Sequence, residues 1–458
     1  MMKLADKKIV VVGLGITGVA VAQFLKKKGA AVIVTDLAAE RNLGQQAQKM
    51  RKMGIPMELG RHSPAVFENA DLIVLSPGVS HTIEPVIQAQ KTGIPVMGEI
   101  ELASRFIREP IVAVTGTNGK TTTTELLGSM LETSGFTVFV GGNIGNPLIG
   151  YVDSEQQVDV IVAEISSFQL DTIAEFRPKI GVLLNITVDH LDRYPDFNAY
   201  AASKIRLFEN QHEDDIAILN GSDPLICSLT ENLKGRKLIY PNPASNQDGA
   251  VLNNHHIILC SDKFAGHGEK PRRRISLDIS KTKLRGRHNL ENACAAGLAA
   301  LAAGARPRAI QKALNRFRAG AHRLEWIAAI EDVDFYNDSK ATNVDAVIRA
   351  VACFTRPVVL IMGGLDKGGN FLTLREIVPR HAKNLIVMGS AAERIQSALE
   401  DIVPTLAATS MTDAVEQAYR IASPGDVVLL SPGCASFDMY DNYARRGEDF
   451  RRAVEKLK

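Results

Sequence analysis

The chain has 458 residues, of which 45% are hydrophobic and 23% charged, and this balance is typical of a folded globular protein and excludes a disordered chain. At about 100–200 residues per domain, the length predicts two to four domains. The net charge is only +2, which excludes a global field that would recruit nucleic acid or an acidic membrane. Any anionic ligand must therefore be held by a local site.

The cysteines and the first apolar stretch bear on where the protein works. Five scattered cysteines without a Cys-x-x-Cys pair argue against a disulfide scaffold or a zinc site and indicate a reducing compartment. The uncharged stretch 9–25 has lysines on both sides, as a signal peptide has, but it contains three glycines, Thr17 and Gln23. It also falls short of the roughly 20 apolar residues of a membrane span. We expect a buried strand and helix there, and a cytoplasmic monomer with no membrane span.

Short apolar runs alternate with helical patterns along most of the chain, which predicts parallel sheets covered on both faces. Three such series predict three α/β domains, at residues 1–108, 109–317 and 318–458. A segment near 234–284, with short alternating runs at 256–259 and 275–277, predicts an antiparallel excursion on the middle domain. The other expected strands are 8–12, 32–35, 71–75, 111–115, 158–163, 180–184, 216–220, 335–337, 358–362, 385–388 and 427–430, with helices at 17–28 and 84–92 in the first series.

The first motif is Gly-Leu-Gly-Ile-Thr-Gly at residues 13–18, between a strand and a helix. Its glycines allow a tight turn, and the free N–H groups of the helix start attract a phosphate. Asp36 follows at the end of the next strand, where an acid could bind a ribose hydroxyl. The motif predicts a nucleotide or dinucleotide site in a Rossmann-like domain, although a glycine turn needed only for packing would look the same.

The second motif is Thr-Gly-Thr-Asn-Gly-Lys-Thr-Thr at 115–122, again between an apolar strand and a helix. It offers a nest of N–H donors, the Lys120 ammonium for the β- and γ-phosphates and the Thr121 hydroxyl for Mg²⁺. Val114 stands where the standard phosphate loop has its first glycine, so the loop is a variant. These residues predict a P-loop ATPase-like central domain that binds ATP through Gly116, Thr117, Asn118, Gly119, Lys120, Thr121 and Thr122.

The third group of candidates lies at the carboxyl ends of the middle-domain strands. Glu164 ends one strand and His190 follows the next, so both should face the phosphate loop. A carboxylate and an imidazole can ligate a divalent cation, although either residue alone is more often an ordinary loop residue. Lys204 lies in a helical stretch with apolar neighbours, where a surface lysine is the default interpretation.

The C-terminal third contains polar clusters at 322–323, 337–343, 363–369 and 431–438, three of them at the ends of expected strands. Lysines and hydroxyls gathered at the ligand edge of a parallel sheet suit a substrate that carries carboxylates. Glycine-rich turns with polar caps also occur at many strand–helix junctions. These clusters favour a second Rossmann-like domain that binds an acidic substrate.

With these motifs, the chain resembles the ATP-dependent Mur ligases of bacterial cell-wall synthesis along essentially its whole length. The phosphate loop is shared with folylpolyglutamate synthases, so other strings carry the resemblance. They are the turn at 13–18, Gly-Gly-Asn-Ile-Gly at 141–145, Glu-Ile-Ser-Ser-Phe-Gln-Leu at 164–170 and Asn-Asp-Ser-Lys-Ala-Thr-Asn at 337–343. The last string is similar to that of the members that add D-glutamate.

The resemblance implies an amide ligase that uses ATP to join D-glutamate to UDP-N-acetylmuramoyl-L-alanine through an acyl phosphate. It implies two Mg²⁺ ions, with Lys120, Glu164, His190 and a carbamylated Lys204 as catalytic residues and Thr121, Glu164, His190 and Lys204 around the metals. It implies further ATP contacts from Asn289, Arg323 and Asp338. The implied contacts to the nucleotide sugar are Gly15, Ile16, Thr17, Asp36, Ser76 and Asn143, and those to the amino acid are Lys340, Thr342, Lys367, Ser436 and Phe437.

Three alternatives remain open from the sequence. An NAD-dependent dehydrogenase would use the first glycine turn and Asp36, but it leaves the second phosphate loop unexplained. A nucleotide-sensing module would bind ATP without catalysis. A folylpolyglutamate synthase would add L-glutamate to a folate, although that family lacks an N-terminal domain of this kind.

Overall fold

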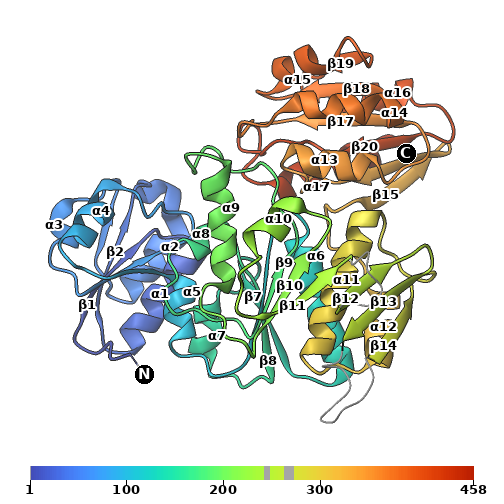
Figure 1. Cartoon of the computed structure of the whole chain (residues 1–458). Helices are drawn as coiled ribbons and strands as arrows, with labels where there is room; N and C mark the ends of the chain where they lie inside the picture. The colour runs from blue at the N-terminus through green and yellow to red at the C-terminus, as the bar shows by residue number, and fades with distance from the viewer. Residues whose placement is uncertain (1, 242–247, 262–272) are drawn as a thin grey trace.

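The computed structural model describes residues 2–241, 248–261 and 273–458, which form three α/β domains in chain order (Figure 1). The N-terminal domain contains a five-stranded parallel sheet in the order β3-β2-β1-β4-β5. Its elements are β1 (Lys8–Val12), α1 (Ile16–Lys27), β2 (Ala31–Asp36), α2 (Glu40–Lys52), β3 (Met57–Leu59), α3 (Pro64–Phe67), β4 (Leu72–Leu75), α4 (Glu84–Lys91), β5 (Val96–Gly98) and α5 (Glu99–Ser104).

The central domain contains a nine-stranded sheet in the order β14-β13-β12-β11-β10-β9-β6-β8-β7. Seven strands, β6 to β12, pair in parallel. The last two, β13 and β14, continue the sheet from β12 in antiparallel pairs and form the predicted excursion. Residues 242–247 and 262–272 of that segment lie outside the described residues. The elements are β6 (Ile111–Thr115), α6 (Lys120–Ser134), β7 (Val138–Gly142), α7 (Leu148–Ser154), β8 (Val160–Glu164), α8 (Ser167–Leu170), β9 (Ile180–Leu183), α9 (Phe197–Ile205), η1 (Arg206–Phe208), β10 (Ile216–Asn220), α10 (Pro224–Leu229), β11 (Arg236–Tyr240), β12 (Gly249–Leu252), β13 (His256–Ser261), β14 (Arg273–Asp278), α11 (Arg287–Ala302) and α12 (Pro307–Arg316).

The C-terminal domain contains a six-stranded sheet in the order β15-β16-β20-β17-β18-β19, which is parallel except at its β15 edge. Its elements are β15 (Glu325–Ile330), β16 (Val333–Asn337), α13 (Val344–Val351), β17 (Val358–Gly363), η3 (Phe371–Glu376), α14 (Val378–His381), β18 (Ala382–Met388), α15 (Ala392–Leu399), β19 (Thr405–Ala407), α16 (Met411–Ile421), β20 (Val427–Leu430) and α17 (Tyr443–Glu455).

The sequence did not predict β15. A two-residue turn, Glu331-Asp332, joins it to β16, and both residues have positive φ, at 48° and 62°. That geometry belongs to a tight hairpin, which usually carries Asn-Gly or Asp-Gly. Because two acidic residues occupy the turn here, the usual sequence signal for a hairpin is missing.

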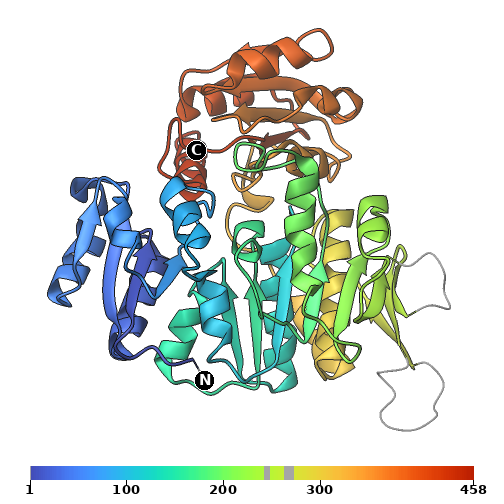
Figure 2. The same cartoon turned by 60° about the vertical axis from the view of Figure 1, so that its left-hand side comes forward.

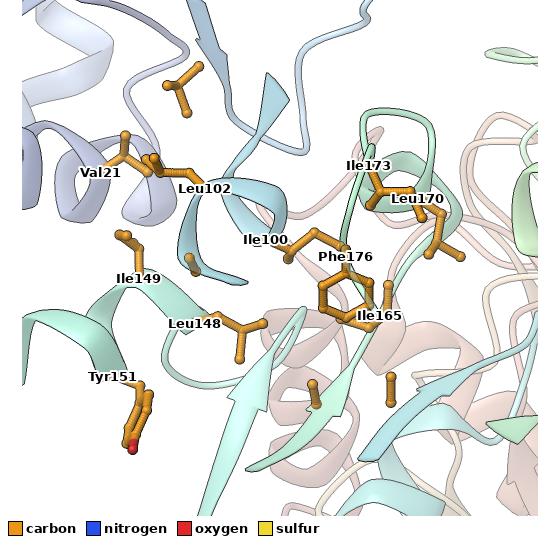
Figure 3. Packing of buried hydrophobic residues seen from close by; sticks show 14 of the residues in the cluster. Val21, Ile100, Leu102, Leu148, Ile149, Tyr151, Ile165, Leu170, Ile173 and Phe176 are labelled. Carbon is orange, nitrogen blue, oxygen red and sulfur yellow. The ribbon is translucent and has the colours of Figure 1, made fainter. Parts of the chain in front are cut away.

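The N-terminal and central domains share one apolar core, as Figure 3 shows for part of it. Val21 and Leu102 of the first domain belong to the same buried cluster as Ile149 and Phe176 of the second. Burial of apolar surface is the main favourable contribution to such packing, at about 25 cal/mol per Å². The shared cluster therefore joins these two domains through apolar packing.

Two buried glutamates of α5 reinforce this junction. Glu101 is completely buried and accepts backbone N–H groups from Ala174, Glu175 and Phe176, at 2.9–3.2 Å. Glu99 accepts the Ile149 N–H at 2.7 Å, near the start of α7. Both carboxylates thus bind backbone groups of the central domain across the domain boundary.

The C-terminal domain is joined to the central domain differently. Its two apolar clusters share no residue with those of the other domains in the part of the chain that the structure describes. Polar contacts cross the boundary instead, among them Asn118 Nδ2 to Asn343 Oδ1 at 3.2 Å and Asn118 Nδ2 to Asp345 Oδ2 at 2.9 Å. Figure 2 shows this domain above the central sheet. No helix among the described residues is both long and apolar enough to cross a membrane.

Candidate active site

A cavity of about 570 Å³ lies between the N-terminal and central domains, at the carboxyl ends of β1, β2 and β4. The loop after β7 closes its other side. All six residues predicted for the nucleotide sugar line it, namely Gly15, Ile16, Thr17, Asp36, Ser76 and Asn143. The structure therefore brings the whole predicted set together, including Asn143 from a different domain.

Glycine is required where helix α1 begins. A Cβ on Gly18 would lie 1.8 Å from the carbonyl oxygen of Gly13, so no larger residue fits there. The Ser76 hydroxyl donates to the same carbonyl at 2.9 Å and holds the turn against β4. This packing leaves the first N–H groups of α1 facing the cavity, as an anion site requires.

Asp36 holds the loops that surround it. Its two carboxylate oxygens accept the N–H groups of Leu14 at 2.6 Å and Ala38 at 2.7 Å. Each oxygen can accept a second hydrogen bond, so a contact to a ligand is compatible with this arrangement. The side chains of Ile16 and Leu37, 75% and 64% exposed, add two apolar walls to the same cavity.

The phosphate loop joins β6 to α6 as predicted. Gly119 precedes the helix with φ +87°, and a Cβ there would lie 2.5 Å from Asn292 Oδ1. The Lys120 ammonium donates to the carbonyls of Gly116 at 2.8 Å and Thr117 at 2.9 Å. Burial lowers the pKa of Lys120, while nearby Glu164 and Asp189 raise it. An incoming phosphate would offer this ammonium a charged partner in place of two carbonyls.

Glu164 connects the phosphate loop to the cavity between the N-terminal and central domains. It is 2% exposed and lies at the end of β8. The Thr121 hydroxyl donates to its Oε2 at 2.7 Å, and Asn143 Nδ2 donates to its Oε1 at 2.8 Å. One carboxylate therefore touches both the loop predicted to bind ATP and the wall of the neighbouring cavity.

His190 lies on the segment that follows β9, with its ring 4.7 Å from that of Phe168. Its φ of +57° is uncommon for a residue other than glycine, and such strain is often found at functional sites. Burial lowers its pKa to about 4, against the opposing effect of Asp189. The imidazole is therefore neutral near pH 7 and has a lone pair available for a metal ion.

Lys204 is not the surface lysine that its sequence context suggests by default. It is 1% exposed on α9 and donates to the Gly116 carbonyl at 2.9 Å. Its ammonium also lies 4.7 Å from the centre of the Tyr200 ring. No carboxylate in the described chain lies within salt-bridge distance of it. Burial, with Lys120 nearby, lowers its pKa well below the ordinary value.

The predicted ATP residues from the last two domains meet beside the phosphate loop. Asn289, Arg323 and Asp338 line one small cavity together with Asn118 and Gly119. Burial raises the pKa of Asp338 to about 7, while the N–H of Leu324 and the hydroxyl of Ser431 lower it. His288 and Asn292 line the same cavity, and both were missed because neither belongs to a local motif.

The five residues predicted for the amino acid are not gathered in one cavity. Thr342 and Lys367 line a cavity of about 270 Å³ between the last two domains, whereas Lys340 lines the small cavity beside the phosphate loop. Ser436 is buried and Phe437 is 70% exposed, and neither lines these two cavities. Their shared role stays a prediction.

Four cations nevertheless lie near one another around the phosphate loop. Burial, together with repulsion from Arg323, Lys120 and Lys367, lowers the pKa of Lys340 to about 8. The Lys340 ammonium lies 3.8 Å from the Tyr443 ring centre. Cations that repel one another in a partly buried site are stabilised when anions bind between them. This field suits a ligand with several negative charges.

The donor set fits Mg²⁺ only in part. Glu164, Thr121 and His190 supply the oxygen and nitrogen ligands that were predicted, but the described residues contain no group of three histidine, cysteine or acidic side chains arranged around a metal position. Mg²⁺ commonly keeps several waters and shares its remaining ligands with substrate phosphates. The chain alone therefore presents a partial site that phosphate oxygens would complete.

Several contacts between domains were missed by the sequence analysis. Asn343 caps α13 and also donates to Asp189 Oδ2 at 3.1 Å, while Asn118 bonds to Asn343 and Asp345. The cap could be read locally from an asparagine before a helix. The partners of Asn343 in the central domain lie more than 150 residues away, and no local pattern predicts them.

Family comparisons agree with these three domains. The MurD-like N-terminal domain of Mur ligases matches residues 7–98, the Mur ligase middle domain matches 114–300, and the glutamate ligase domain of Mur ligases matches 322–434. The fold is shared with a pseudomurein peptide ligase type C from Methanothermus fervidus, at a TM-score of 0.60 and 20% identity over 99% of this chain and all of that one. It is also shared with the MurF ligase from Thermotoga maritima, at a TM-score of 0.59 and 15% identity over the full length of both.

Domain content, phosphate loop and fold together define a Mur ligase. Among curated relatives, the UDP-N-acetylmuramoylalanine--D-glutamate ligase of Desulfatibacillum aliphaticivorans is 51% identical over the whole of both chains. The protein of the same name from Desulfosudis oleivorans is 49% identical over 99% of this chain and 97% of its own. The chain belongs to the UDP-N-acetylmuramoylalanine--D-glutamate ligase family.

Proposed function

We propose that the protein joins D-glutamate to UDP-N-acetylmuramoyl-L-alanine in an ATP-dependent reaction of peptidoglycan precursor synthesis. Relatives that carry this name match the chain over its full length. The arrangement of the site agrees with this reaction. The cavity between the N-terminal and central domains, which we propose as the nucleotide-sugar cavity, is followed by the phosphate loop and then by the cations Arg323 and Lys340 of the C-terminal domain.

The observation that carries the proposal is the double contact of Glu164. Its two oxygens accept Thr121 of the phosphate loop and Asn143 of the nucleotide-sugar cavity, at 2.7 and 2.8 Å. The end of a substrate lying in that cavity and the terminal phosphate of ATP would therefore meet at one carboxylate. A dehydrogenase or a simple nucleotide sensor has no need for this junction.

In the first step, an oxygen of the substrate carboxylate attacks the γ-phosphorus of ATP, the bond to ADP breaks, and an acyl phosphate forms. Both reactants are anions, so their approach requires positive charge between them. Lys120 is placed to supply it once phosphates replace its present carbonyl partners, Gly116 and Thr117. One Mg²⁺ held by Thr121 and Glu164, and a second held beside His190, would neutralise further charge.

In the second step, the amine of D-glutamate attacks the acyl carbon, and inorganic phosphate leaves with the bridging oxygen. The amine must be deprotonated, and both carboxylates of D-glutamate need cationic partners. We propose Lys340, Thr342, Lys367, Ser436 and Phe437 for this role. The pKa of Lys340 is lowered to about 8 by burial and then by repulsion from neighbouring cations, and a bound dianion would relieve that repulsion.

We also propose that Lys204 is carbamylated. Its burial lowers the pKa of the amine, so more of it is neutral and nucleophilic. A neutral amine adds to the carbon of CO₂ and loses one proton, which gives an N-carboxylate with two oxygen donors. The product would turn a buried lysine near the phosphate loop into a ligand for a second Mg²⁺ beside His190.

The proposal extends to the domain boundaries, the compartment and the oligomeric state. We place domain boundaries near residues 108 and 317, outside the strands of the three sheets. We also propose that the reaction takes place in the cytoplasm, which ATP as a co-substrate and five free cysteines, among them the buried Cys260, Cys294 and Cys434, support. We propose a monomeric enzyme.

The test is phosphate release by the purified protein with ATP, Mg²⁺ and UDP-N-acetylmuramoyl-L-alanine. D-Glutamate should support release, whereas L-glutamate, L-alanine and a diamino acid should not. A folate with L-glutamate tests for folylpolyglutamate synthase activity, and this pair should release no phosphate. The Lys120→Ala variant should lose ligation while it keeps its fold. Phosphate release only with the folate and L-glutamate, or no phosphate release with D-glutamate, would overturn the proposal.

A further inference from the structure

Arg193 lies three residues after His190 and reaches across to the N-terminal domain. One guanidinium nitrogen donates to the carbonyl of Gly78 at 3.1 Å, and the other donates to the carbonyl of Val79 at 2.7 Å. Gly78 and Val79 line the nucleotide-sugar cavity. The side chain therefore ties a central-domain segment to the wall of a substrate cavity in another domain.

The same guanidinium also contacts an aromatic ring next to His190. Its central carbon lies 4.0 Å from the centre of the Phe168 ring, and that ring lies 4.7 Å from the His190 ring. The Arg193 N–H donates to the His190 carbonyl at 3.0 Å, which closes a tight turn between the two residues. Arg193 is thus connected to His190 both through the backbone and through Phe168.

Charge alone does not explain this placement. Within the described chain, no acidic side chain lies within salt-bridge distance of Arg193, although Asp171 and Asp192 are near enough to raise its pKa. Burial lowers that pKa. A guanidinium with two carbonyl acceptors and one ring face is fixed in direction as well as position.

The segment 187–195 also contacts the other two parts of the site. The Thr187 N–H donates to the hydroxyl of Thr117 in the phosphate loop at 3.0 Å. Asp189 accepts from Lys367 of the C-terminal domain at 2.8 Å. His190 follows Asp189 directly and precedes Arg193 by three residues, so a shift on either side of it would move the imidazole.

We propose that Arg193 is a positioning residue that couples occupation of the nucleotide-sugar cavity to the placement of His190 for metal binding. A ligand that orders the loop at Gly78 and Val79 would fix the guanidinium, and the guanidinium would fix Phe168 and the His190 ring. This inference rests on the proposed function for the identity of the ligand. By linkage, the nucleotide sugar should tighten metal binding, and the metal should tighten nucleotide-sugar binding by the same factor.

The coupling can be measured without turnover. Mn²⁺ is titrated into the intact protein and followed by electron paramagnetic resonance, with and without saturating UDP-N-acetylmuramoyl-L-alanine. The wild-type protein should bind Mn²⁺ several-fold more tightly when the nucleotide sugar is present. Arg193→Ala should abolish that difference, and Phe168→Leu should reduce it while nucleotide-sugar affinity is retained. Arg193→Lys keeps the charge with a different donor geometry and should give an intermediate difference in Mn²⁺ affinity. It replaces the alanine variant in the test if that variant fails to fold.

Arg306→Ala is the matched control, because Arg306 also donates to a backbone carbonyl of the central domain, that of Ser134 at 2.8 Å, but contacts no part of the site. It should keep the wild-type coupling. In steady-state assays, Arg193→Ala should raise the KM for the nucleotide sugar and lower kcat, each on the order of tenfold. Equal tightening of Mn²⁺ binding in the wild type and in Arg193→Ala and Arg193→Lys would overturn the inference. Absence of phosphate release by the wild type would instead contradict the proposed function, and the binding titrations would still decide the coupling.

Discussion

The Lys367 ammonium of the C-terminal domain lies 2.8 Å from Asp189 Oδ1 of the central domain. Asp189 is nearly buried, and Lys367, His190 and Asn343 lower its pKa against the effect of burial, so it carries a negative charge. A lysine proposed to bind a substrate carboxylate thus already has a carboxylate partner from the protein. An incoming D-glutamate must compete with that partner.

Replacing Asp189 by asparagine tests this competition. Asp189→Asn keeps the shape and an acceptor but removes the charge, so the KM for D-glutamate should fall several-fold while kcat also falls, because His190 is adjacent. Lys367→Ala should raise the same KM more than tenfold. A KM for D-glutamate that is identical in Asp189→Asn and the wild type would show that the pair does not limit access to Lys367.

Lys204 provides a test of the carbamate. Lys204→Ala should lose most of its turnover, since no oxygen ligand then replaces the carbamate. Short carboxylic acids, such as acetate or propionate, should partly restore activity by filling the space of the missing group. Lys120→Ala serves as the control, because the same acids should not restore it. Full activity of Lys204→Ala without additive would remove the proposed role.

Glu164 should set the Mg²⁺ requirement. Its carboxylate accepts hydrogen bonds from Thr121 and Asn143. In Glu164→Gln the amide keeps one acceptor but loses the charge, so the Mg²⁺ concentration for half-maximal activity should rise at least tenfold. Titration of phosphate release with Mg²⁺ measures this. An unchanged titration curve would exclude Glu164 as a ligand.

Much of the site could be predicted because its signals are local. The glycine turn at 13–18 and the phosphate loop each combine a strand, a glycine-rich turn and a helix in about ten residues, and both form as expected. All six candidates for the nucleotide sugar line one cavity. Contacts such as Asn118 with Asn343 depend on how two domains meet, and no local pattern encodes that. Lys340 and Lys367 were grouped by resemblance, but the structure places them in different cavities.

Glu99 gives the fold a specific pH dependence. Burial raises its pKa to about 7 from 4.5, although the N–H groups of Ile149 and Leu148 lower it. Between these values the folded protein binds more protons than the unfolded chain, so this group lowers the free energy of unfolding as the pH rises from 4.5 to 7. The loss is at most about 3 kcal/mol and is complete above pH 7.

Glu99→Gln should therefore be more stable relative to the wild type at pH 8 than at pH 5. Denaturant unfolding at both pH values measures the difference. Glu101→Gln is the neighbouring control, and it should lose stability at pH 8 because its carboxylate accepts three backbone N–H groups and pairs with Arg105. Parallel pH profiles for Glu99→Gln and the wild type would contradict the assignment.

The fate of one oxygen atom tests the proposed chemistry most directly. UDP-N-acetylmuramoyl-L-alanine labelled with ¹⁸O in both oxygens of its alanine carboxylate is converted with ATP, Mg²⁺ and D-glutamate, and the released phosphate is examined by mass spectrometry. The account predicts one ¹⁸O in each phosphate, because the attacking oxygen leaves with the phosphoryl group, and one ¹⁸O in the new amide. Unlabelled phosphate formed together with the amide product would show that no acyl phosphate lies on the path.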